Sequence, residues 1–496
     1  MIGACVTAEK KNARLKIFNT MTRRKQLVVP IESGSVRMYC CGPTVYDYQH
    51  IGNMRTYVWQ DVLRRTLEFD GYKVKHVRNI TDVGHLTSQA DSGQDKVEES
   101  AKKRHKTAWE ISEMFMNIFF DDTETLNILP PHVSPRATQH IKEMLELIKK
   151  LEEKGYTYVI EKDGIYYDTS KFKHYGKLTG MSFDELNKYL KGGARVELVP
   201  GKKHITDFAL WKFSPENVKR DMEWDSPYGK GFPGWHIECS AMSMKYLGES
   251  FDIHCGGVDH IPIHHTNEIA QSEGATGKRF AKYWVHGEFL EVDGKKMSKS
   301  LGNFYTVDDI IKKGYSWREL RYALMAAHYR SLLNFTFKAL DAARGSIERI
   351  AEFIRNLSNI TEEGPENKGI RKIVDSAFGR FVGAVNDDLN MPKALAELFG
   401  MISKINKEIE KGAVKKDDAK YIIDAVLVLD RILGLKLEEF AKQGVVPEEV
   451  MKLLEERRKA REERNFELAD RIRKRIRDEY GFIIEDTKNG EVIKKA

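Results

Sequence analysis

The chain has 496 residues, more than one hydrophobic core normally supports, so about two to four domains are expected. Hydrophobic residues make up 41 % of the sequence and charged residues 31 %, which excludes an intrinsically disordered or membrane-embedded protein. The formal net charge of +7 suits a polyanionic partner, but it is equally compatible with an ordinary solvated surface.

The sequence contains neither an apolar run of about 18 residues nor the apolar stretch of a secretory signal, so a cytoplasmic protein without membrane contact is expected. Its cysteines are few, odd in number and widely spaced, which argues against a disulfide framework and favours metal or substrate chemistry. They are Cys5, Cys40, Cys41, Cys239 and Cys255.

The first α/β pattern starts with a short apolar strand over residues 36–41 that breaks at Gly42 and Pro43. A helix is predicted over residues 54–69, and a second strand rich in Val and Ile over residues 72–80. These elements form a β-α-β unit, so a parallel sheet is expected.

An insertion follows this unit. Helical periodicity over residues 96–126 gives way to prolines and then to another helix over residues 136–155. Residues 156–234 alternate short strand-like pieces with Gly, Pro and Asp turns, which predicts a connective domain within the nucleotide-binding fold.

A second α/β half is predicted from helix 235–247, strand 251–254, helix 262–273 and strand 283–292, and it ends at a loop rich in Lys and Ser. From residue 307 onward the pattern is helical until a final strand-like segment near residues 480–486. The sequence thus predicts an α/β catalytic domain followed by a helical region.

The run from Cys41 to Asn53 leaves a strand and enters a helix, where α/β sheets bind nucleotides. Backbone amides at this point favour an anion, and Gly52 permits close approach to the backbone. His50 and Asn53 offer hydrogen bonds to phosphate oxygens as charge develops. The alternative is a pair of helix-capping side chains in a turn.

The Lys- and Ser-rich loop spans residues 294–302 and carries Lys296 and Lys299 together with Ser298 and Ser300. Two ammonium groups on a glycine-flanked loop can clamp pyrophosphate, although a solvated turn is the alternative. The two motifs, in this order and with an insertion between them, resemble the HIGH and KMSKS signatures of class I aminoacyl-tRNA synthetases. Asn53 stands where the second His of the first signature usually lies.

Candidate metal ligands lie on a predicted helix after Pro262, where His264 and Glu268 are four residues apart and share one face. Cys239 lies on another predicted helix, and Cys41 ends the first strand. Two sulfurs, one imidazole and one carboxylate suit Zn²⁺ better than Ca²⁺ or Mg²⁺. Taken singly, the cysteines could instead be core residues, and His264 with Glu268 a surface ion pair.

The chain resembles the cysteinyl-tRNA synthetase family nearly from end to end, and the segments that carry this resemblance are MYCCG, RNITD, GWHIECSAM, FDIHCGG, HHTNEIAQS and KMSKSLGN. The resemblance implies one zinc ion on Cys41, Cys239, His264 and Glu268. It places Thr81, Trp235 and His254 around bound cysteine, and Gly256, Gly257 and Asp259 beside the adenosine. Cys40 and His265 match no ligand position, and Cys255 replaces a glycine that is common in the family.

The activity implied by the resemblance is ATP-dependent ligation of L-cysteine to tRNA(Cys) through a cysteinyl-adenylate, with Mg²⁺ accompanying ATP. His50, Asn53, Lys296 and Lys299 would stabilise phosphate charge, and a zinc-bound thiolate would distinguish cysteine from serine. A monomer is expected. The alternatives are a cysteine ligase acting on an amino sugar and a catalytically silent zinc-containing RNA-binding paralogue.

The expected architecture is a Rossmann-type parallel-sheet domain with an inserted connective domain, followed by a helical anticodon-binding bundle and a small C-terminal α/β module. The predicted boundaries are 1–14 for an N-terminal extension, 15–120 for the first Rossmann half, 121–234 for the connective insertion, 235–306 for the second half, 307–369 for a helical connector that contacts the tRNA stem, 370–446 for the bundle and 447–496 for the anticodon-reading module.

Overall fold

The computed structural model describes residues 14–84, 95–192, 199–215, 220–443, 448–463, 465–487 and 490–495. Residues 1–13, with Cys5 and nearly all of the predicted N-terminal extension, lie outside the described residues. Among the helices of the described ranges, none has the length and apolar character needed to cross a membrane.

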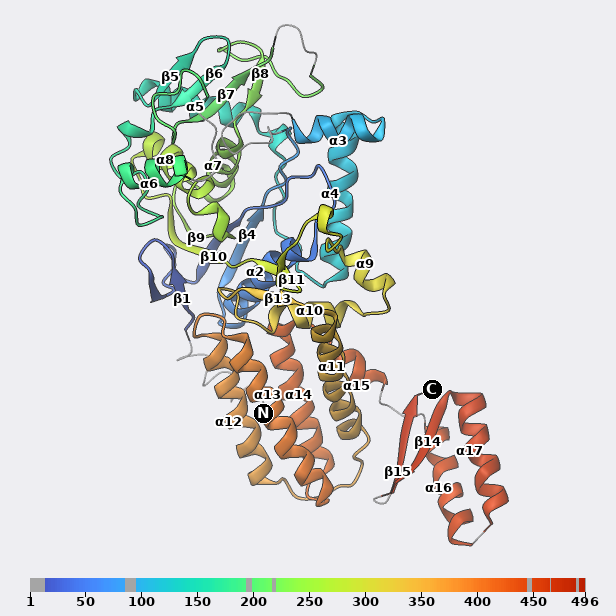
Figure 1. Cartoon of the computed structure of the whole chain (residues 1–496). Helices are drawn as coiled ribbons and strands as arrows, with labels where there is room; N and C mark the ends of the chain where they lie inside the picture. The colour runs from blue at the N-terminus through green and yellow to red at the C-terminus, as the bar shows by residue number, and fades with distance from the viewer. Residues whose placement is uncertain are drawn as a thin grey trace.

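A four-stranded parallel sheet in the order β10-β9-β3-β4 forms the centre of the N-terminal half, which confirms the predicted Rossmann-type sheet (Figure 1). Its strands are β3 (Ser35–Cys40), β4 (Lys73–Arg78), β9 (Phe251–Gly257) and β10 (Ala281–Gly287). The chain proceeds outward from β3 to β4 on one side and from β9 to β10 on the other. The switch point between β3 and β9 is where open α/β sheets bind ligands.

The two faces of this sheet are covered by different helices. Because successive strand residues point to opposite faces, Met38 and Cys40 join the apolar cluster of α2, whereas Tyr39 and Cys41 join the cluster of α7 and α8. The helices of this half are α2 (Ile51–Phe69), α3 (Lys96–Arg104), α4 (Ala108–Thr125), α7 (Trp235–Leu247) and α8 (His264–Thr276).

The helix predicted over residues 96–126 is two helices in the structure. The chain leaves α3 at His105, whose backbone is left-handed with φ of 54°. It re-enters a helix after Thr107, which shares a capping box with Glu110. The periodicity of apolar residues continues through the break, so it did not reveal the turn.

The strand predicted over residues 283–292 is likewise interrupted. It is divided into β10 and β11 (Leu290–Val292), which belong to different sheets. The Arg55 guanidinium donates hydrogen bonds to the carbonyls of Glu288 and Phe289 between the two strands. Both carbonyls therefore face α2, and the Phe289 carbonyl also accepts a hydrogen bond from the Leu333 backbone N–H at 3.1 Å.

The connective insertion contains an antiparallel sheet in the order β5-β6-β7-β8. Its elements are α5 (Ile141–Glu153), β5 (Thr157–Ile160), β6 (Gly164–Tyr167), α6 (Phe183–Gly192), β7 (Phe208–Phe213) and β8 (Gly231–Pro233). An N-terminal hairpin, β1 (Lys16–Asn19) and β2 (Arg24–Leu27), precedes β3.

After β11 the chain forms β12 (Lys295–Lys296) and, 37 residues beyond β12, β13 (Leu333–Phe335), with α9 (Val307–Lys312) and α10 (Trp317–Met325) in between. β13 pairs parallel with β11, so the prediction of helix throughout this region is wrong for these residues. A strand this short has no recognisable alternation and depends on its partner.

The C-terminal half is helical, as predicted, and Figure 1 shows a bundle followed by a separate small unit. The bundle contains α11 (Phe337–Ser358), α12 (Lys368–Val385), α13 (Met391–Glu410), α14 (Lys416–Leu433) and α15 (Glu438–Gln443). The last unit contains α16 (Glu448–Glu462), α17 (Phe466–Tyr480), β14 (Phe482–Thr487) and β15 (Gly490–Lys495). Its apolar cluster is distinct from that of the bundle.

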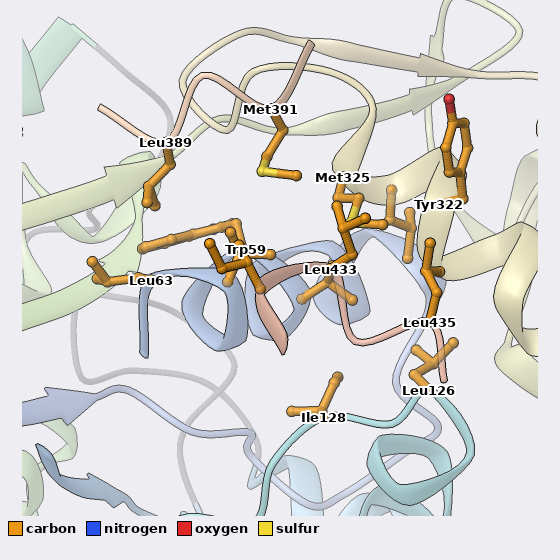
Figure 2. Packing of buried hydrophobic residues seen from close by; sticks show 14 of the residues in the cluster. Trp59, Leu63, Leu126, Ile128, Tyr322, Met325, Leu389, Met391, Leu433 and Leu435 are labelled. Atoms are coloured by element: carbon orange, nitrogen blue, oxygen red, sulfur yellow. The ribbon is translucent and has the colours of Figure 1, made fainter. Parts of the chain in front are cut away.

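Helix α2 connects the sheet to this bundle. Figure 2 shows Trp59 and Leu63 of α2 packed near Met325 and Leu433 in one buried apolar cluster. Beside them, the Asp61 carboxylate accepts a hydrogen bond from Arg321 of α10 at 2.5 Å, and both side chains are fully buried. Helix α2, which His50 caps, is thereby held by the C-terminal half at Trp59, Asp61 and Leu63.

Candidate active site and metal-ligand cluster

A cavity of about 560 Å³ lies at the switch point of the sheet. It is bordered by the loop after β3, the start of α2, the start of α7, the end of β9 and the Lys-rich loop. The predicted site residues that line it are Cys41, His50, Asn53, Thr81, Trp235, Cys239, Gly256, Gly257, Asp259, His264 and Lys299. The others, Gly52, His254, Glu268 and Lys296, lie outside its lining.

His50 and Asn53 cap the start of α2. Nδ1 of His50 accepts a hydrogen bond from the Asn53 backbone N–H at 3.1 Å, and Asn53 Oδ1 accepts from the His50 backbone N–H at 3.1 Å. Burial lowers the pKa of His50 and so favours the neutral ring. Because Nδ1 is an acceptor, the neutral ring carries its proton on Nε2 and offers a donor from the cavity wall.

Gly52 gives the His50 ring its space. A Cβ atom at this position would lie 3.0 Å from both Cε1 and Nδ1 of that ring. The glycine therefore permits the packing of His50 at the helix N-terminus, where the partial positive charge of the helix favours an anion.

The two lysines of the Lys-rich loop are placed differently. Lys299 lines the cavity, forms an ion pair with Asp47, and lies 5.0 Å from the centre of the Phe304 ring. Lys296 is exposed on β12, where its backbone carbonyl accepts a hydrogen bond from Asn303 at 3.2 Å. Only one of the two ammonium groups that the sequence predicts at the phosphates therefore borders the cavity in this arrangement.

Donor atoms of Cys41, Cys239 and His264, which line the cavity, and of Glu268, which does not, lie within 4.8 Å of one another, and all four residues are buried. A second group, Cys41, His254, His265 and Glu268, satisfies the same distance and shares two members with the first. The first group coincides with the set predicted from sequence. His265, which matched no predicted ligand position, belongs to the second.

Glu268 lies at the centre of both groups. Its Oε1 is 3.1 Å from His264 Nε2 and 3.9 Å from the Cys41 sulfur, and its Oε2 is 2.8 Å from His254 Nε2. The Cys41 sulfur also lies 3.3 Å from His265 Nε2. One carboxylate oxygen thus faces the predicted ligands and the other faces His254.

The protonation preferences of these groups follow from their mutual contacts. Burial opposes charge on Glu268, but His254 and His264 outweigh it and lower the pKa of Glu268 to about 2. Burial is likewise outweighed at His264, where Glu268 and Cys239 raise the pKa to about 10. A hydrogen bond from Cys41 lowers the pKa of Cys239 to about 7, whereas burial raises the pKa of Cys41. The cluster therefore favours a carboxylate and one thiolate, which are metal-binding forms, and a protonated His264, whose proton must leave when this ring binds a metal.

The fold explains this convergence. Cys41 follows the last residue of β3, and α7 and α8 bring Cys239, His264 and Glu268 to the same face of the sheet. His264 and Glu268 are one helical turn apart on α8. A buried set of two sulfurs, one imidazole and one carboxylate has the composition of a tetrahedral zinc site.

The residues predicted around the amino acid surround this cluster. The rings of Trp235 and His264 have centroids 4.8 Å apart. The Thr81 hydroxyl donates to Glu238 Oε2 at 3.0 Å and accepts from the Asn79 amide at 3.1 Å. His254 contacts Glu268 and is stacked on Trp284, with centroids 4.6 Å apart, so it lies behind the carboxylate.

The predicted adenosine-side residues are close to the end of β9. A Cβ atom on Gly256 would lie 2.5 Å from the His265 ring, and one on Gly257 would lie 2.4 Å from Asp259 Oδ1. Gly256 therefore requires glycine in this packing, whereas a Cβ at Gly257 would meet only the end of the Asp259 side chain, which can turn away.

Several cavity residues were not selected from sequence. They include Tyr46, Asp47, Asn79, Lys96 and His260. Asp47 lies inside the predicted phosphate-binding run from Cys41 to Asn53, so its charge could have identified it as a site residue. Lys96 could not be identified in this way. It is the first residue of a predicted helix, and the position of that helix beside the cavity depends on the tertiary fold.

Comparison with known proteins supplies a further finding. The family model described as "tRNA synthetases class I (C) catalytic domain" matches residues 27–345, and the model described as "DALR domain" matches residues 380–438. A cysteine–tRNA ligase of Treponema denticola is 45 % identical, with 97 % of this chain and 99 % of that protein covered. Cysteine–tRNA ligase 1 of Burkholderia lata is 46 % identical, with 96 % of each covered.

A solved structure of methionyl-tRNA synthetase from Mycobacterium tuberculosis, in complex with methionyl-adenylate, has a TM-score of 0.57 to this chain. Its sequence identity is 15 %, and the match covers 85 % of this chain and 93 % of that one. This likeness concerns the fold alone.

Proposed function

Because this chain belongs to the cysteine–tRNA ligase family of class I aminoacyl-tRNA synthetases, we propose that it activates L-cysteine with ATP and esterifies it to tRNA(Cys). The observation that carries the proposal in detail is that donor atoms of Cys41, Cys239, His264 and Glu268 lie within 4.8 Å of one another, with the first three residues in the cavity lining. Groups that can bind a metal, and through it a thiol, thus line the same cavity as the residues proposed to bind ATP.

Cys41, Cys239, His264 and Glu268 would hold one zinc ion. When bound, zinc supplies a Lewis acid that accepts the substrate thiolate and lowers the thiol pKa from its free value of about 8.5. Serine is nearly isosteric with cysteine, but its hydroxyl is a poor ligand. A preference of about 5 kcal/mol exceeds a thousandfold and makes a separate editing domain unnecessary.

The reaction has two steps, and the surrounding side chains stabilise the phosphate charge. The cysteine carboxylate attacks the α-phosphorus of ATP, the bond to the β-phosphate oxygen breaks, and pyrophosphate leaves. His50 offers Nε2–H to the phosphates and Asn53 its amide, while Lys299 adds positive charge. A terminal ribose hydroxyl of tRNA then attacks the adenylate carbonyl, and AMP leaves. Mg²⁺ would accompany ATP and offset part of the phosphate charge.

Lys296 needs a change in the loop to take part. It lies on the exposed β12 while Lys299 is at the cavity, and the loop between them is held by Asn303, which accepts a hydrogen bond from the Ser298 backbone N–H at 2.8 Å. We propose that the loop closes over the triphosphate and brings Lys296 to it.

The C-terminal region would bind tRNA. We propose that residues 307–369 contact the tRNA stem, that residues 370–446 form the anticodon-binding bundle and that residues 447–496 read the anticodon. Lys459 and Arg475 pair with acids on their own helices, at 3.7 and 2.9 Å, so these helices carry both charges. Lys459 and Arg475 can still bind tRNA phosphates, because exposed ion pairs are weak. We further propose a monomer acting in the cytoplasm.

The two alternative functions have less support. An amino-sugar ligase of this superfamily lacks a long C-terminal region, whereas residues 380–438 of this chain match the DALR domain and its cysteine–tRNA ligase relatives are covered nearly in full. A silent paralogue would not need His50 and Lys299 at a common cavity. ATP–pyrophosphate exchange with cysteine separates these classes.

The decisive experiment is tRNA charging with cysteine and with serine, before and after removal of metal. The metal-replete enzyme should charge tRNA(Cys) with cysteine at least about a thousandfold more efficiently than with serine. Chelation should abolish cysteine charging, and added Zn²⁺ should restore it. Equal charging by the stripped enzyme would overturn the proposed role of zinc.

A further inference from the structure

Lys96 lies in the wall of the same cavity as His50 and Lys299. It is the first residue of α3, and its ammonium nitrogen is 5.6 Å from the centre of the Tyr46 ring. Its side chain is half-buried, and burial lowers its pKa. Within the described ranges, Lys96 forms no ion pair with a carboxylate.

The start of α3 is firmly anchored, so the position of Lys96 is well defined. Asp95 Oδ1 accepts hydrogen bonds from the backbone N–H groups of Val97 and Glu98 at 2.8 and 3.1 Å, which caps the helix. Asp95 is also ion-paired with the buried Arg220, whose guanidinium carbon is 3.9 Å from the centre of the Phe232 ring. An anchored neighbour holds Lys96 at the cavity without compensating its charge.

A second contact fixes α3 to the loop between β3 and α2. The Ser100 hydroxyl donates a hydrogen bond to the Tyr46 carbonyl at 2.7 Å, and Arg104 donates to the Ser100 hydroxyl at 2.7 Å. Tyr46, over which the Lys96 ammonium lies, is therefore tied to the same helix. The Ser100–Tyr46 hydrogen bond and the Lys96–Tyr46 contact therefore hold the start of α3 against the loop that precedes α2.

The charges around the cavity differ in how they are balanced. Lys299 is paired with Asp47, and Arg104 also approaches Asp47, at 3.3 Å. Among the described residues, the Lys96 ammonium contacts the Tyr46 ring face and no carboxylate, and a ring compensates a cation weakly. A partly desolvated ammonium without an acidic partner gains most from an incoming anion.

We propose that Lys96 binds a phosphate group of the reactants directly. The inference rests on the proposed function, because the cavity must receive ATP and then the 3′ end of tRNA. Two sources offer the same chemistry: the phosphates of ATP and pyrophosphate, or the last phosphate of the tRNA acceptor end. Lys96 thereby adds a further contact to phosphate beside those proposed for His50, Asn53 and Lys299.

The test uses the full-length enzyme with Lys96→Met, which keeps the aliphatic stem over Tyr46 and removes the charge. Lys96→Arg keeps the charge, and Lys102→Ala is the matched control because Lys102 is an exposed lysine of the same helix. Each variant is assayed for ATP–pyrophosphate exchange without tRNA and for single-turnover transfer from preformed adenylate to tRNA. Thermal unfolding compares their folding with that of the parent.

Lys96→Met should lose about tenfold or more in one of the two assays, with Lys96→Arg recovering much of the loss and Lys102→Ala unchanged. A loss in exchange assigns the phosphate to ATP, and a loss confined to transfer assigns it to tRNA. Parental values for Lys96→Met in both assays would overturn the proposal, as would an equal loss in Lys96→Arg.

Calorimetric titration with magnesium pyrophosphate, in the absence of cysteine, separates this inference from the proposed function. If the parent enzyme binds pyrophosphate but does not activate cysteine, the function is wrong while the phosphate contact is still measured. Weaker binding by Lys96→Met then supports a contact to ATP phosphates. Binding at the parental level excludes that source, and a filter-binding comparison with tRNA then decides for or against the tRNA phosphate.

Discussion

Lys299 of the Lys-rich loop forms an ion pair with Asp47, although 252 residues separate them in the sequence. Asp47 lies three residues before His50, and Asp47, His50 and Lys299 all border the cavity. The ammonium group proposed to meet phosphate is therefore neutralised by a carboxylate before nucleotide binds. ATP must compete with Asp47 for this cation, while the carboxylate itself repels the triphosphate.

Replacing this carboxylate should strengthen nucleotide binding. In Asp47→Asn the side chain keeps its size but loses its charge, so the KM for ATP in pyrophosphate exchange should fall about two- to fivefold, which is the range of an exposed ion pair. Asp293→Asn, at an exposed position beside the same loop, should leave the KM unchanged. An increase in KM would mean that Asp47 instead holds Lys299 in its working position.

The two adjacent cysteines should behave oppositely. Cys41→Ala removes a proposed zinc ligand, so the bound zinc and the rate of cysteine activation should both fall, by more than about a hundredfold for the rate. Cys40→Ala is the matched control, because Cys40 points to the α2 face of the sheet. It should retain zinc. Metal analysis of the purified variants, together with exchange kinetics, checks both outcomes, and zinc retention in Cys41→Ala would contradict the ligand assignment.

The sequence predicted those parts of the site that local periodicity controls. The strand directly before Cys41 and the one-turn spacing of His264 and Glu268 follow from periods of 2 and 3.6 residues, which need no knowledge of distant contacts. The pairing of Asp47 with Lys299 and the approach of Lys96 depend on how separate elements pack. No local pattern contains that information.

The errors in the predicted elements have the same origin. Apolar periodicity runs through His105, where the chain turns, and the β10–β11 break occurs where Arg55 of α2 takes two carbonyls of the intervening residues. In each case a backbone conformation or a long-range hydrogen bond overrode the local preference.

Removing the buried charge pair between the two halves should destabilise the enzyme. Arg321 donates to Asp61 and also to the backbone carbonyls of Leu433 and Leu126, two residues that Figure 2 labels in the buried cluster. Arg321→Met leaves the Asp61 carboxylate with Arg65 and the Leu129 backbone N–H, at 2.7 and 2.9 Å, so the free energy of unfolding should fall by about 2–4 kcal/mol. Arg318→Met, whose partner Glu439 is exposed, should cost less than about 1 kcal/mol in the same denaturant titration.

Asp122 should make stability depend on pH. This carboxyl borders a second cavity, of about 830 Å³, between α4 and α9, and burial together with Asp121 and Asp308 raises its pKa to about 7. Since the usual pKa of Asp is about 3.9, the folded chain holds a proton here that the unfolded chain releases. This contribution to stability is full below about pH 4 and is lost as the pH rises toward 7.

Asp122→Asn removes that dependence. At pH 8 the variant should be more stable than the parent by roughly 2 kcal/mol, after allowance for water at the cavity wall, and near pH 4 the difference should vanish. Thermal and urea unfolding across this range, with exposed Glu124→Gln of the same helix as the control, measure the effect. Because a carboxylate that was already ionised at pH 5 would give the same difference at pH 5 and pH 8, a constant difference would show that Asp122 is not protonated in the folded enzyme.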